Sequence, residues 1–408
     1  MIYIHFPFCK SFCTYCDFYS VRERGKMEQY KEALLREIDA RRAFFMRCAE
    51  PATLYIGGGT PSLCPAEWLA EIISAVRNAG GKAGELSELT VEVNPDDMTP
   101  EYALGLRGLG VNRVSMGVQS FSDVSLRWMN RRHTAAGARE AYRMLREAGF
   151  GNISLDLIFG YDPVPWGAPA TPRDLLMQQW REDLEQMLLL RPEHISAYQM
   201  GVEEGSVLGE KSSAGLYREP SDELCAAQYA LLQQMLSEAG YEQYEVSNFA
   251  LPGRQAIHNS GYWERLPYIG LGPGAHSFDG DRRRSWNAPD VDLYIRRWLP
   301  EVSPGPEIPV GTSACSESAP YRTDDVSNTC AASGSETLTD EDVLVEKVML
   351  GLRKASGLLL SDVPELDPLT VARLVSSGSL VEDAGRICIP PSKLFISDTV
   401  IRSLLPAD

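Results

Sequence analysis

Short apolar segments alternate with amphipathic helical segments over the first 200 residues, and this alternation restricts the fold more than any other feature. Strands and helices that alternate in this way form a parallel sheet with helices outside it. Six units are too few for the closed eight-stranded barrel, so we predict an α/β fold with a partial (β/α)6 barrel. The predicted strands are 2–5, 54–56, 89–93, 113–117, 153–158 and 194–198, and the predicted helices are 27–47, 66–78, 100–109, 124–129, 135–148 and 173–190.

The rest of the chain divides by composition into three further regions. The barrel is predicted over 1–250, with a helix at 223–239 and a strand at 241–246, and 251–302 is a connecting region. Residues 303–338 are rich in Ser, Pro, Thr and Gly without periodicity, which predicts a flexible low-complexity insert. Helical patterns return over 339–408 around an extended pair, which predicts a small C-terminal winged-helix-like α+β module. Such modules often bind DNA, but the acidic charge favours packing or protein contact here.

Composition restricts the partners and the compartment. The 408-residue chain has a net charge of −17 and no large basic patch, which argues against a nucleic-acid surface and limits membrane contact to a transient one. The N-terminus MIYIHFPF lacks a basic region and a long apolar stretch, and no segment reaches the ~20 apolar residues of a membrane span. The nine cysteines are spaced too unevenly for a secreted disulfide framework. We therefore expect a cytoplasmic protein.

Three cysteines near the N-terminus suggest chemistry. Cys9, Cys13 and Cys16 lie in HFPFCKSFCTYCDF, with the spacing C-x3-C-x2-C and no fourth cysteine nearby. Three thiolates can hold three irons of a cubane cluster and leave the fourth iron open, whereas an electron-carrying cluster usually takes four. A Cys13–Cys16 redox disulfide and a zinc site with His5 as fourth ligand are the alternatives, and the spacing alone leaves all three open.

Polar motifs follow the predicted strands, where functional groups of βα barrels gather. A glycine run, GGGTP at 57–61, lets the backbone approach a ligand closely. A buried carboxylate at Glu92 requires a cation or hydroxyl partner, and a salt bridge within the barrel is the alternative to a ligand. The Arg131 guanidinium can bind a carboxylate. Together these groups predict one polar site at the barrel mouth. The strand-end residues are Glu92, Asn94, Gln119, Ser120, Asp156, His194, Ser196 and Tyr198.

At this point the chain resembles the radical SAM superfamily, in which S-adenosylmethionine chelates the open iron of a [4Fe–4S] cluster. The resemblance implies that the cluster donates an electron that cleaves the sulfonium to a 5′-deoxyadenosyl radical. The family usually has an aromatic residue before the third cysteine, and Tyr15 supplies it. Further motifs resemble the HemN/HemW group, namely GGGTPS at 57–62, VEVNP at 91–95, RVSMGVQSF at 113–121, DLIFG at 156–160, HISAY at 194–198, YEVSNFA at 244–250, HNSGYW at 258–263 and GLGPGAHSF at 270–278.

The group has an oxidase branch, the oxygen-independent coproporphyrinogen III oxidases, and a heme-chaperone branch. The oxidases usually carry a further cysteine where this chain has Phe18, and a longer N-terminal extension. The HNSGYW segment fits the HN-x-x-YW pattern associated with heme binding. The resemblance therefore favours the chaperone branch, with heme, an unidentified heme-acceptor protein and a homodimer as partners. Radical decarboxylation by an oxidase, or another radical SAM reaction, is the alternative.

The resemblance also assigns residues. Cys9, Cys13 and Cys16 would hold the cluster, and Tyr3, Gly58 and Glu92 would contact S-adenosylmethionine. Further positions would line the same mouth, and in the oxidase they hold a second S-adenosylmethionine: Tyr15, Gly59, Thr60, Gln119, Arg131 and Asp156. His258 is the predicted heme ligand, with His276 and His133 as competitors; the bland alternative for His258 is a hydrogen-bonding or capping role. No catalytic residue is assigned.

Overall fold

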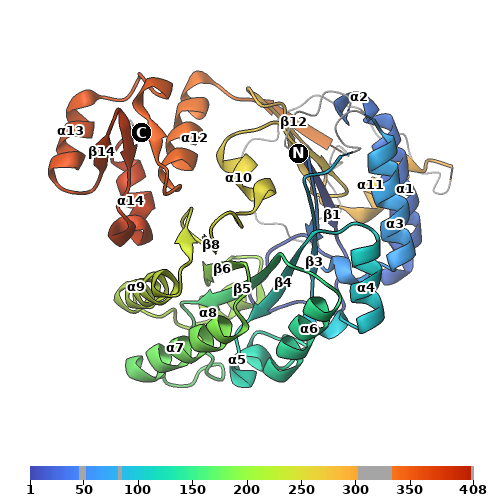
Figure 1. Cartoon of the computed structure of the whole chain (residues 1–408), viewed down its shortest axis with the longest axis horizontal. Coiled ribbons are helices and arrows are strands. Elements are labelled where there is room, and N and C mark those ends of the chain that lie inside the picture. Colours follow the sequence, from blue (N-terminus) through green and yellow to red (C-terminus); the bar gives the residue numbers. More distant parts are fainter. Residues whose placement is uncertain (46–51, 81–84, 302–332, 406–408) are drawn as a thin grey trace.

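A nine-stranded sheet forms the centre of the protein in the computed structural model, which describes residues 1–45, 52–80, 85–301 and 333–405 (Figure 1). The strand order is β7-β8-β6-β5-β4-β3-β2-β1-β9, and β1 to β6 are parallel neighbours in chain order. The predicted partial barrel of six parallel strands is confirmed. These strands are β1 Ile2–Phe6, β2 Thr53–Gly58, β3 Glu88–Val93, β4 Arg113–Gln119, β5 Ile153–Phe159 and β6 His194–Gln199.

Helices connect the strands and cover the outer face of the sheet (Figure 1). Five of the six predicted helices end within two residues of their predicted bounds, while the helix predicted over 27–47 ends early and is followed by a short second helix. No helix in the described part of the chain is long and apolar enough to cross a bilayer. The helices are α1 Met27–Ala40, α2 Arg42–Phe45, α3 Ala66–Asn78, α4 Pro100–Gly108, α5 Asp123–Trp128, α6 Ala135–Glu147, α7 Arg173–Leu190, α8 Val207–Ser213, α9 Asp222–Glu238, α10 Ile257–Trp263 and α11 Val291–Trp298.

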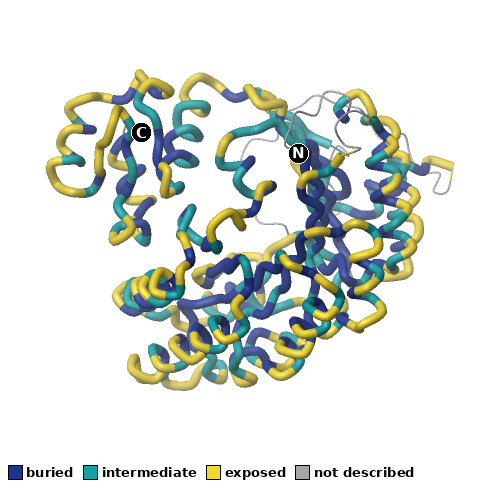
Figure 2. The backbone as a smooth tube through the Cα atoms, viewed as in Figure 1, coloured by how far each residue is buried: buried dark blue, intermediate teal, exposed yellow. Residues whose placement is uncertain are grey.

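The two faces of the sheet differ sharply in chemistry. On β4, Val114, Met116 and Val118 point outward into the apolar core beneath the helices, and each is fully buried. The alternate positions, Arg113 and Ser115, point into the barrel, since side chains of a strand alternate between its faces. Figure 2 shows these strands as the buried centre of the molecule. The apolar outer face holds the helices, and the polar inner face forms a site.

The region predicted as a connection beyond residue 250 completes the sheet. β9, Ile269–Leu271, pairs parallel with β1, so the central sheet continues beyond the predicted barrel boundary at residue 250. The strand predicted at 241–246 is shorter: β7 is Glu242–Gln243, and the chain turns back into β8, Asn248–Ala250, which pairs antiparallel with β6. The link between β7 and β8 is so short that these two strands can pair only antiparallel.

A second sheet lies beside β9 and includes part of the predicted insert. β10 His276–Phe278, β11 Arg283–Asn287 and β12 Ser333–Thr337 form an antiparallel sheet in that order. β12 falls within the 303–338 region that was predicted to be flexible. Gly334 of β12 faces the Trp286 ring, and a Cβ on Gly334 would lie 2.5 Å from it. The remainder of the predicted insert, 303–332, lies outside the described residues.

The C-terminal module has the predicted order of helix, helix, hairpin and helix. Ala384 and Gly385 form the hairpin turn, both with positive φ (49° and 75°), as a type I′ turn requires. The module docks on the barrel edge, where the Ala355 N–H donates to the Tyr244 carbonyl and the Phe395 ring packs on Tyr229. Its elements are α12 Asp340–Leu352, β13 Leu358–Leu359, α13 Pro368–Ser376, β14 Val381–Asp383, β15 Arg386–Cys388 and α14 Ser397–Arg402.

Candidate functional site

A cavity of about 450 Å³ opens at the carboxyl ends of the parallel strands and runs down into the barrel. All three cysteines and eight of the ten predicted cofactor-binding residues line it. The two exceptions are Tyr3, which lies on the inner face of β1 with its hydroxyl 3.0 Å from His5 Nδ1, and His258. The residues brought together are Cys9, Cys13, Cys16, Tyr15, Gly58, Gly59, Thr60, Glu92, Gln119, Arg131 and Asp156.

The glycine run that ends β2 is required by close packing. A Cβ on Gly57 would lie 2.8 Å from Glu92 Oε1, and one on Gly59 would lie 3.0 Å from Cys9 Sγ. Gly58 has φ of +111° and faces the His5 ring, where a Cβ would lie 2.7 Å away. Each glycine therefore leaves space for a different part of the site.

The cysteine loop is fixed by its backbone and faces the cavity. Thr14, within the loop, donates its N–H to the Met129 carbonyl and accepts from the Leu208 N–H, while Cys9 donates to Val21. The three cysteines are free thiols, so the redox disulfide is not formed. The zinc alternative named His5, but both His5 ring nitrogens are hydrogen-bonded, to the Tyr3 hydroxyl and to the Tyr19 carbonyl.

Hydrogen-bond donors surround the sulfur atoms. The Thr60 hydroxyl donates to Cys9 Sγ at 3.5 Å, and Arg131 Nη1 donates to Cys13 Sγ at 3.4 Å. Burial raises the pKa of the Cys9 thiol, and it raises that of Cys16 to about 12. Bare thiolates are therefore disfavoured in this loop, and cations that bind them would displace their protons.

Within the described residues, no three His, Cys, Asp or Glu side chains are grouped to hold a single metal ion. A cubane cluster does not need such a group, because each thiolate binds its own iron. The donor set of three partly exposed thiols, with Thr60 and Arg131 beside them, fits an iron–sulfur cluster with one iron facing the cavity.

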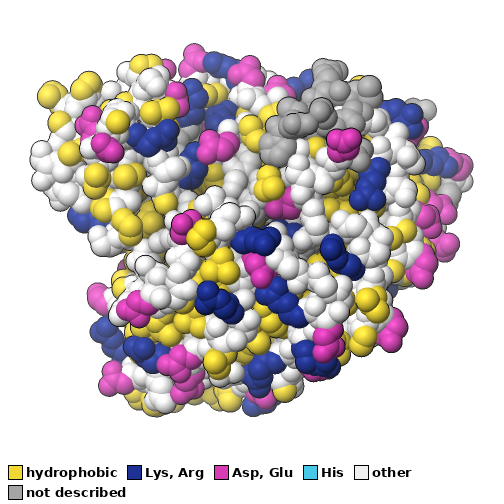
Figure 3. All heavy atoms as spheres, viewed as in Figure 1, with side chains coloured by type: hydrophobic (Ala, Val, Ile, Leu, Met, Phe, Trp, Pro, Cys, Tyr) yellow, Lys and Arg dark blue, Asp and Glu magenta, His cyan; other side chains and the backbone are white. Residues whose placement is uncertain are grey.

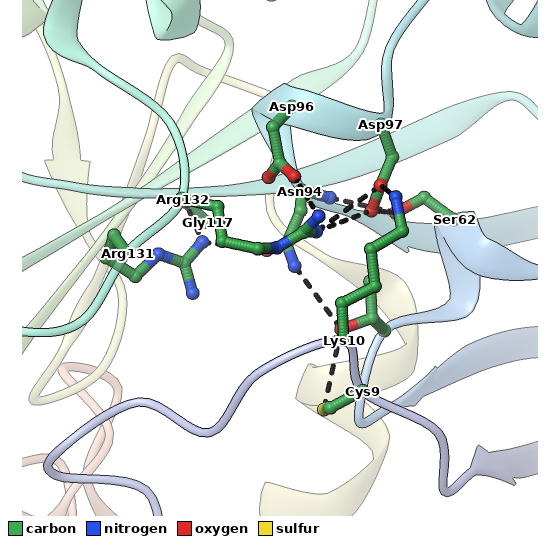
Figure 4. Close-up of polar contacts among 10 residues, drawn as sticks. Cys9, Lys10, Ser62, Asn94, Asp96, Asp97, Gly117, Arg131 and Arg132 are labelled. Atoms are coloured by element: carbon green, nitrogen blue, oxygen red, sulfur yellow. Dashed lines mark hydrogen bonds and ion pairs between the residues drawn. The ribbon is translucent and has the colours of Figure 1, made fainter. Parts of the chain in front are cut away.

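Arg131 joins the cysteine loop to the strand ends (Figure 4). Its Nη2 donates to Asn94 Oδ1 and to the Gly117 carbonyl, both at 2.7 Å. Asn94 in turn donates to Thr60, which reaches Cys9. This chain of hydrogen bonds links two cluster cysteines through the ends of three strands.

An ion-pair network forms the rim beside it (Figure 4). Asp97 accepts from Lys10 at 2.6 Å, from Ser62 at 2.9 Å and from Arg132 at 3.3 Å. Arg132 also pairs with Asp96 at 2.5 Å. Lys10 directly follows Cys9, so the rim ties the cysteine loop to the end of β3.

Gln119 reaches the mouth through an irregular backbone. It has φ of +70°, an uncommon value for a non-glycine residue, and a bulge lies between Gly117 and Gln119 in the β4–β5 pairing. The bulge turns the amide back over Gly117, where a Cβ would lie 2.8 Å from Gln119 Nε2. Sequence periodicity gives no signal for such a bulge.

Two carboxylates face the cavity below the glycines. Glu92 accepts from the Tyr55 hydroxyl at 2.7 Å and from the Gly58 N–H at 3.1 Å. Burial raises the pKa of Glu92 to about 7 and that of Asp156 to about 6, and hydrogen bonds to each oppose the rise. Both groups are placed to bind a cationic or hydroxyl-bearing ligand.

His258 lies at the opposite end of the barrel from the cysteines. The HNSGYW segment is helix α10, and Glu88 at the start of β3 accepts the N–H groups of Ile257 and His258. His258 is 1% exposed, with Nδ1 2.8 Å from Thr53 Oγ1 and Nε2 3.0 Å from the Tyr262 hydroxyl. It offers no free ring nitrogen here, so iron could reach it only after α10 leaves the barrel.

The competing histidines differ in accessibility. His133 is buried and its Nε2 bonds the Val118 carbonyl. His276 is exposed, and its ring stacks on Trp286 with centroids 5.6 Å apart. Heme ligation by any of the three remains a prediction, and His276 is the one that solvent reaches.

Two predicted strand-end residues serve the fold. Ser120 is buried and donates to Asp183 of α7, and His194 lies between Ser154 and Tyr244. Conversely, some cavity-lining residues were missed although the polar positions alternate along their strands: Tyr55, Arg113 and Ser115. Asn259 of α10 also lines the cavity, and no sequence signal places it there.

The mouth carries exposed aromatic side chains. Phe18, which stands where the oxidases carry a cysteine, is 69% exposed and lines the cavity, as do Phe12 and Tyr198. On the face shown in Figure 3, Lys and Arg side chains lie interspersed with Asp and Glu. Apolar contact is therefore available at the mouth, beside the charged rim of Lys10, Asp96 and Arg132.

Comparisons with known proteins agree with this geometry. Residues 3–168 match the Radical SAM superfamily. A protein of Lactococcus lactis named heme chaperone HemW is 33% identical over 88% of this chain and 82% of its own length, and one of Mycobacterium tuberculosis with the same name is 30% identical over 99% and 94%. Coproporphyrinogen III oxidase (HemN) from Escherichia coli aligns with 99% of this chain and 89% of its own, with a TM-score of 0.73 and 20% identity, a likeness of fold alone. This chain belongs to the HemW family of the radical SAM superfamily.

Proposed function

We propose that this protein is a cytoplasmic heme chaperone that binds heme and passes it to an acceptor protein. Cys9, Cys13 and Cys16 would hold a [4Fe–4S] cluster, which supplies an electron to S-adenosylmethionine bound at its open iron. The observation that carries the proposal is a polar cavity with three free thiols at its mouth and, among the described residues, no fourth cysteine beside them. The heme function rests on relatives that are named heme chaperones.

The cavity walls support binding of S-adenosylmethionine beside the cluster. Glu92 and Asp156 would accept from its ammonium and ribose hydroxyls, and Gly58 leaves backbone exposed to the ligand. Tyr15 and Arg131 lie next to the cysteines and would orient the ligand and the loop.

The cluster is tested by anaerobic reconstitution with iron and sulfide. We expect about four irons per chain in the wild type and a strong loss in Cys13→Ser. Cys388→Ser is the matched control, because Cys388 lies in the C-terminal module on β15. Equal iron content in the two variants would overturn the cluster assignment.

Heme binding is tested separately by adding heme to the reconstituted protein and recording the visible spectrum. A shifted Soret band is expected, and its absence would overturn the chaperone proposal. Comparing His258→Ala with His276→Ala identifies the ligand. Formation of protoporphyrinogen from coproporphyrinogen III in the same preparation would instead establish the oxidase alternative.

A further inference from the structure

Arg113 is a buried cation inside the barrel. It opens β4, is 1% exposed, and lines the same cavity as the cysteines. Among the described residues it makes no hydrogen bond or ion pair, and its Nε is buried without a partner. A guanidinium cannot lose its proton in a protein, and burying a charge is costly unless other charges compensate. Something in the barrel must therefore compensate this charge.

The two carboxylates of the cavity lie on the strands that flank Arg113. On β3, Thr90 is opposite Arg113 and Glu92 is opposite Ser115, one step nearer the mouth. On β5, Asp156 is opposite Gly117, a further step up. Because alternate residues share a face, Arg113, Glu92 and Asp156 all project into the barrel, with the guanidinium rising from below.

Neither carboxylate has a cation bonded to it. Glu92 accepts from a phenol and a backbone N–H, and Asp156 from the Ser115 hydroxyl at 3.5 Å. The other cations that line the cavity are already engaged: Arg131 by Cys13, Asn94 and the Gly117 carbonyl, and Lys10 and Arg132 by the carboxylates of the rim. Burial raises the pKa of both carboxyl groups, the charge of Asp156 raises that of Glu92 further, and Arg113 lowers both.

The other titratable groups around these carboxylates stay neutral near pH 7. Burial raises the pKa of Tyr3 and Tyr55, and below Arg113 burial lowers the pKa of His194 and His258. Tyr244 also faces Arg113 and has a raised pKa. Further charged groups nearby are Glu88, which caps α10, Glu245 beside Tyr244, the N-terminal amino group beside His258, and Arg131 at the mouth.

We propose that Arg113 is a positioning residue, a shared counter-ion that keeps Glu92 and Asp156 ionised so that the cavity presents two carboxylates to a cationic ligand. A direct ion pair would occupy the carboxylate oxygens, whereas a guanidinium held apart from both leaves those oxygens free to accept from a ligand. The ligand is taken as the ammonium and sulfonium of S-adenosylmethionine, a step that rests on the proposed function.

The first test follows the two carboxyl groups directly, in the full chain without cluster or ligand. Carbon-13 NMR of labelled Glu and Asp carboxyl groups gives the titrations, and Glu92→Gln and Asp156→Asn assign them. In Arg113→Gln we expect both to titrate at a pH higher by about one unit, with Arg113→Lys close to wild type. Arg139→Gln, on the exposed face of α6, is the control.

Arg113→Met is a second variant that removes the charge, since an apolar side chain of similar length tolerates burial. An unchanged titration of Glu92 and Asp156 in either folded variant would overturn the proposal. The second arm measures S-adenosylmethionine affinity by anaerobic calorimetry on reconstituted protein. Affinity in Arg113→Gln should fall about tenfold at neutral pH and recover as the pH rises. If the wild type binds no S-adenosylmethionine, the proposed function fails while the carboxyl titration still decides the role of Arg113.

Discussion

Replacing His258 by alanine separates a structural from a ligating role for the HNSGYW histidine. In the structure His258 joins α10 to β2 through Thr53 and lies against the Tyr55 ring, with centroids 5.2 Å apart. A histidine built into the barrel in this way should contribute to stability. A heme ligand should contribute to heme affinity.

The magnitude follows from the groups left behind. Thr53 is fully buried, so its unpaired hydroxyl costs about 2 kcal/mol, whereas the partly exposed Tyr262 hydroxyl can turn to water and costs about 1 kcal/mol. Lost packing against Tyr55 adds about 1 kcal/mol. We expect a total loss near 4 kcal/mol, or roughly 10 °C in the barrel's unfolding midpoint.

The loss should depend on pH with a defined sign. Burial lowers the pKa of His258 to about 3, from 6.5 in the unfolded chain, so the unfolded state binds the proton more tightly. The stabilisation by the neutral ring is complete above pH 6.5 and declines as the pH falls below it. The cost of His258→Ala should therefore shrink from about 4 kcal/mol at pH 8 to about 2 kcal/mol at pH 5.

Denaturant unfolding of the cluster-free protein at both pH values measures this cost, with His276→Ala as the control because that ring is exposed. We expect His276→Ala to change stability by less than about 0.5 kcal/mol. A His258→Ala variant of wild-type stability that has lost heme binding would refute the structural reasoning and establish the ligating role.

Three further predictions concern the cavity and the C-terminal hairpin. Glu92→Gln should stabilise the ligand-free protein by about 2 kcal/mol more at pH 8 than at pH 5. The pKa of Glu92 is raised to about 7 in the folded protein, so folding of the wild type becomes less favourable as the pH rises from the unfolded pKa toward 7. Denaturant unfolding at the two pH values checks this, and a pH-independent effect contradicts it. Gly59→Ala should lower iron incorporation severalfold, since its Cβ would lie 3.0 Å from Cys9 Sγ, whereas Gly108→Ala has no atom within 4 Å and should match wild type in the iron assay. Ala384→Asn should stabilise the module by about 1 kcal/mol, because Asn tolerates the positive φ of a type I′ turn; a lower thermal midpoint would contradict this.

The sequence was sufficient for the barrel because its outward face is repetitive. Residues such as Val114, Met116 and Val118 mark a buried strand by hydrophobicity alone, and amphipathic helices between strands imply parallel order. The short edge strands β7, β8 and β9 could not be predicted in this way. Their pairing is set by where distant segments meet and not by their own periodicity.

Most residues predicted at strand ends line the cavity, whereas most cavity-lining residues inside the strands, apart from Asp156, were missed. Gly58, Glu92 and Arg131 stand at strand ends or after them, where polar residues interrupt an apolar pattern. Arg113 lies in a strand, and a charged residue in a strand normally indicates a solvent-exposed position. Only the structure shows that this position faces the inside of the barrel. The burial of His258 depends on α10 packing against β2, which no local pattern encodes.

The two ends of the barrel perform different tasks. At the lower end, Glu88 caps α10 and His258 bonds Thr53, so these groups have protein partners. Toward the mouth, Glu92 and Asp156 keep free lone pairs, and below them the Arg113 side chain has no direct partner among the described residues. Polar groups that are buried but incompletely satisfied are costly in a ligand-free fold and gain most when a polar ligand enters. The incompletely satisfied end is the one that carries the cysteines, so a polar ligand would gain most by binding there.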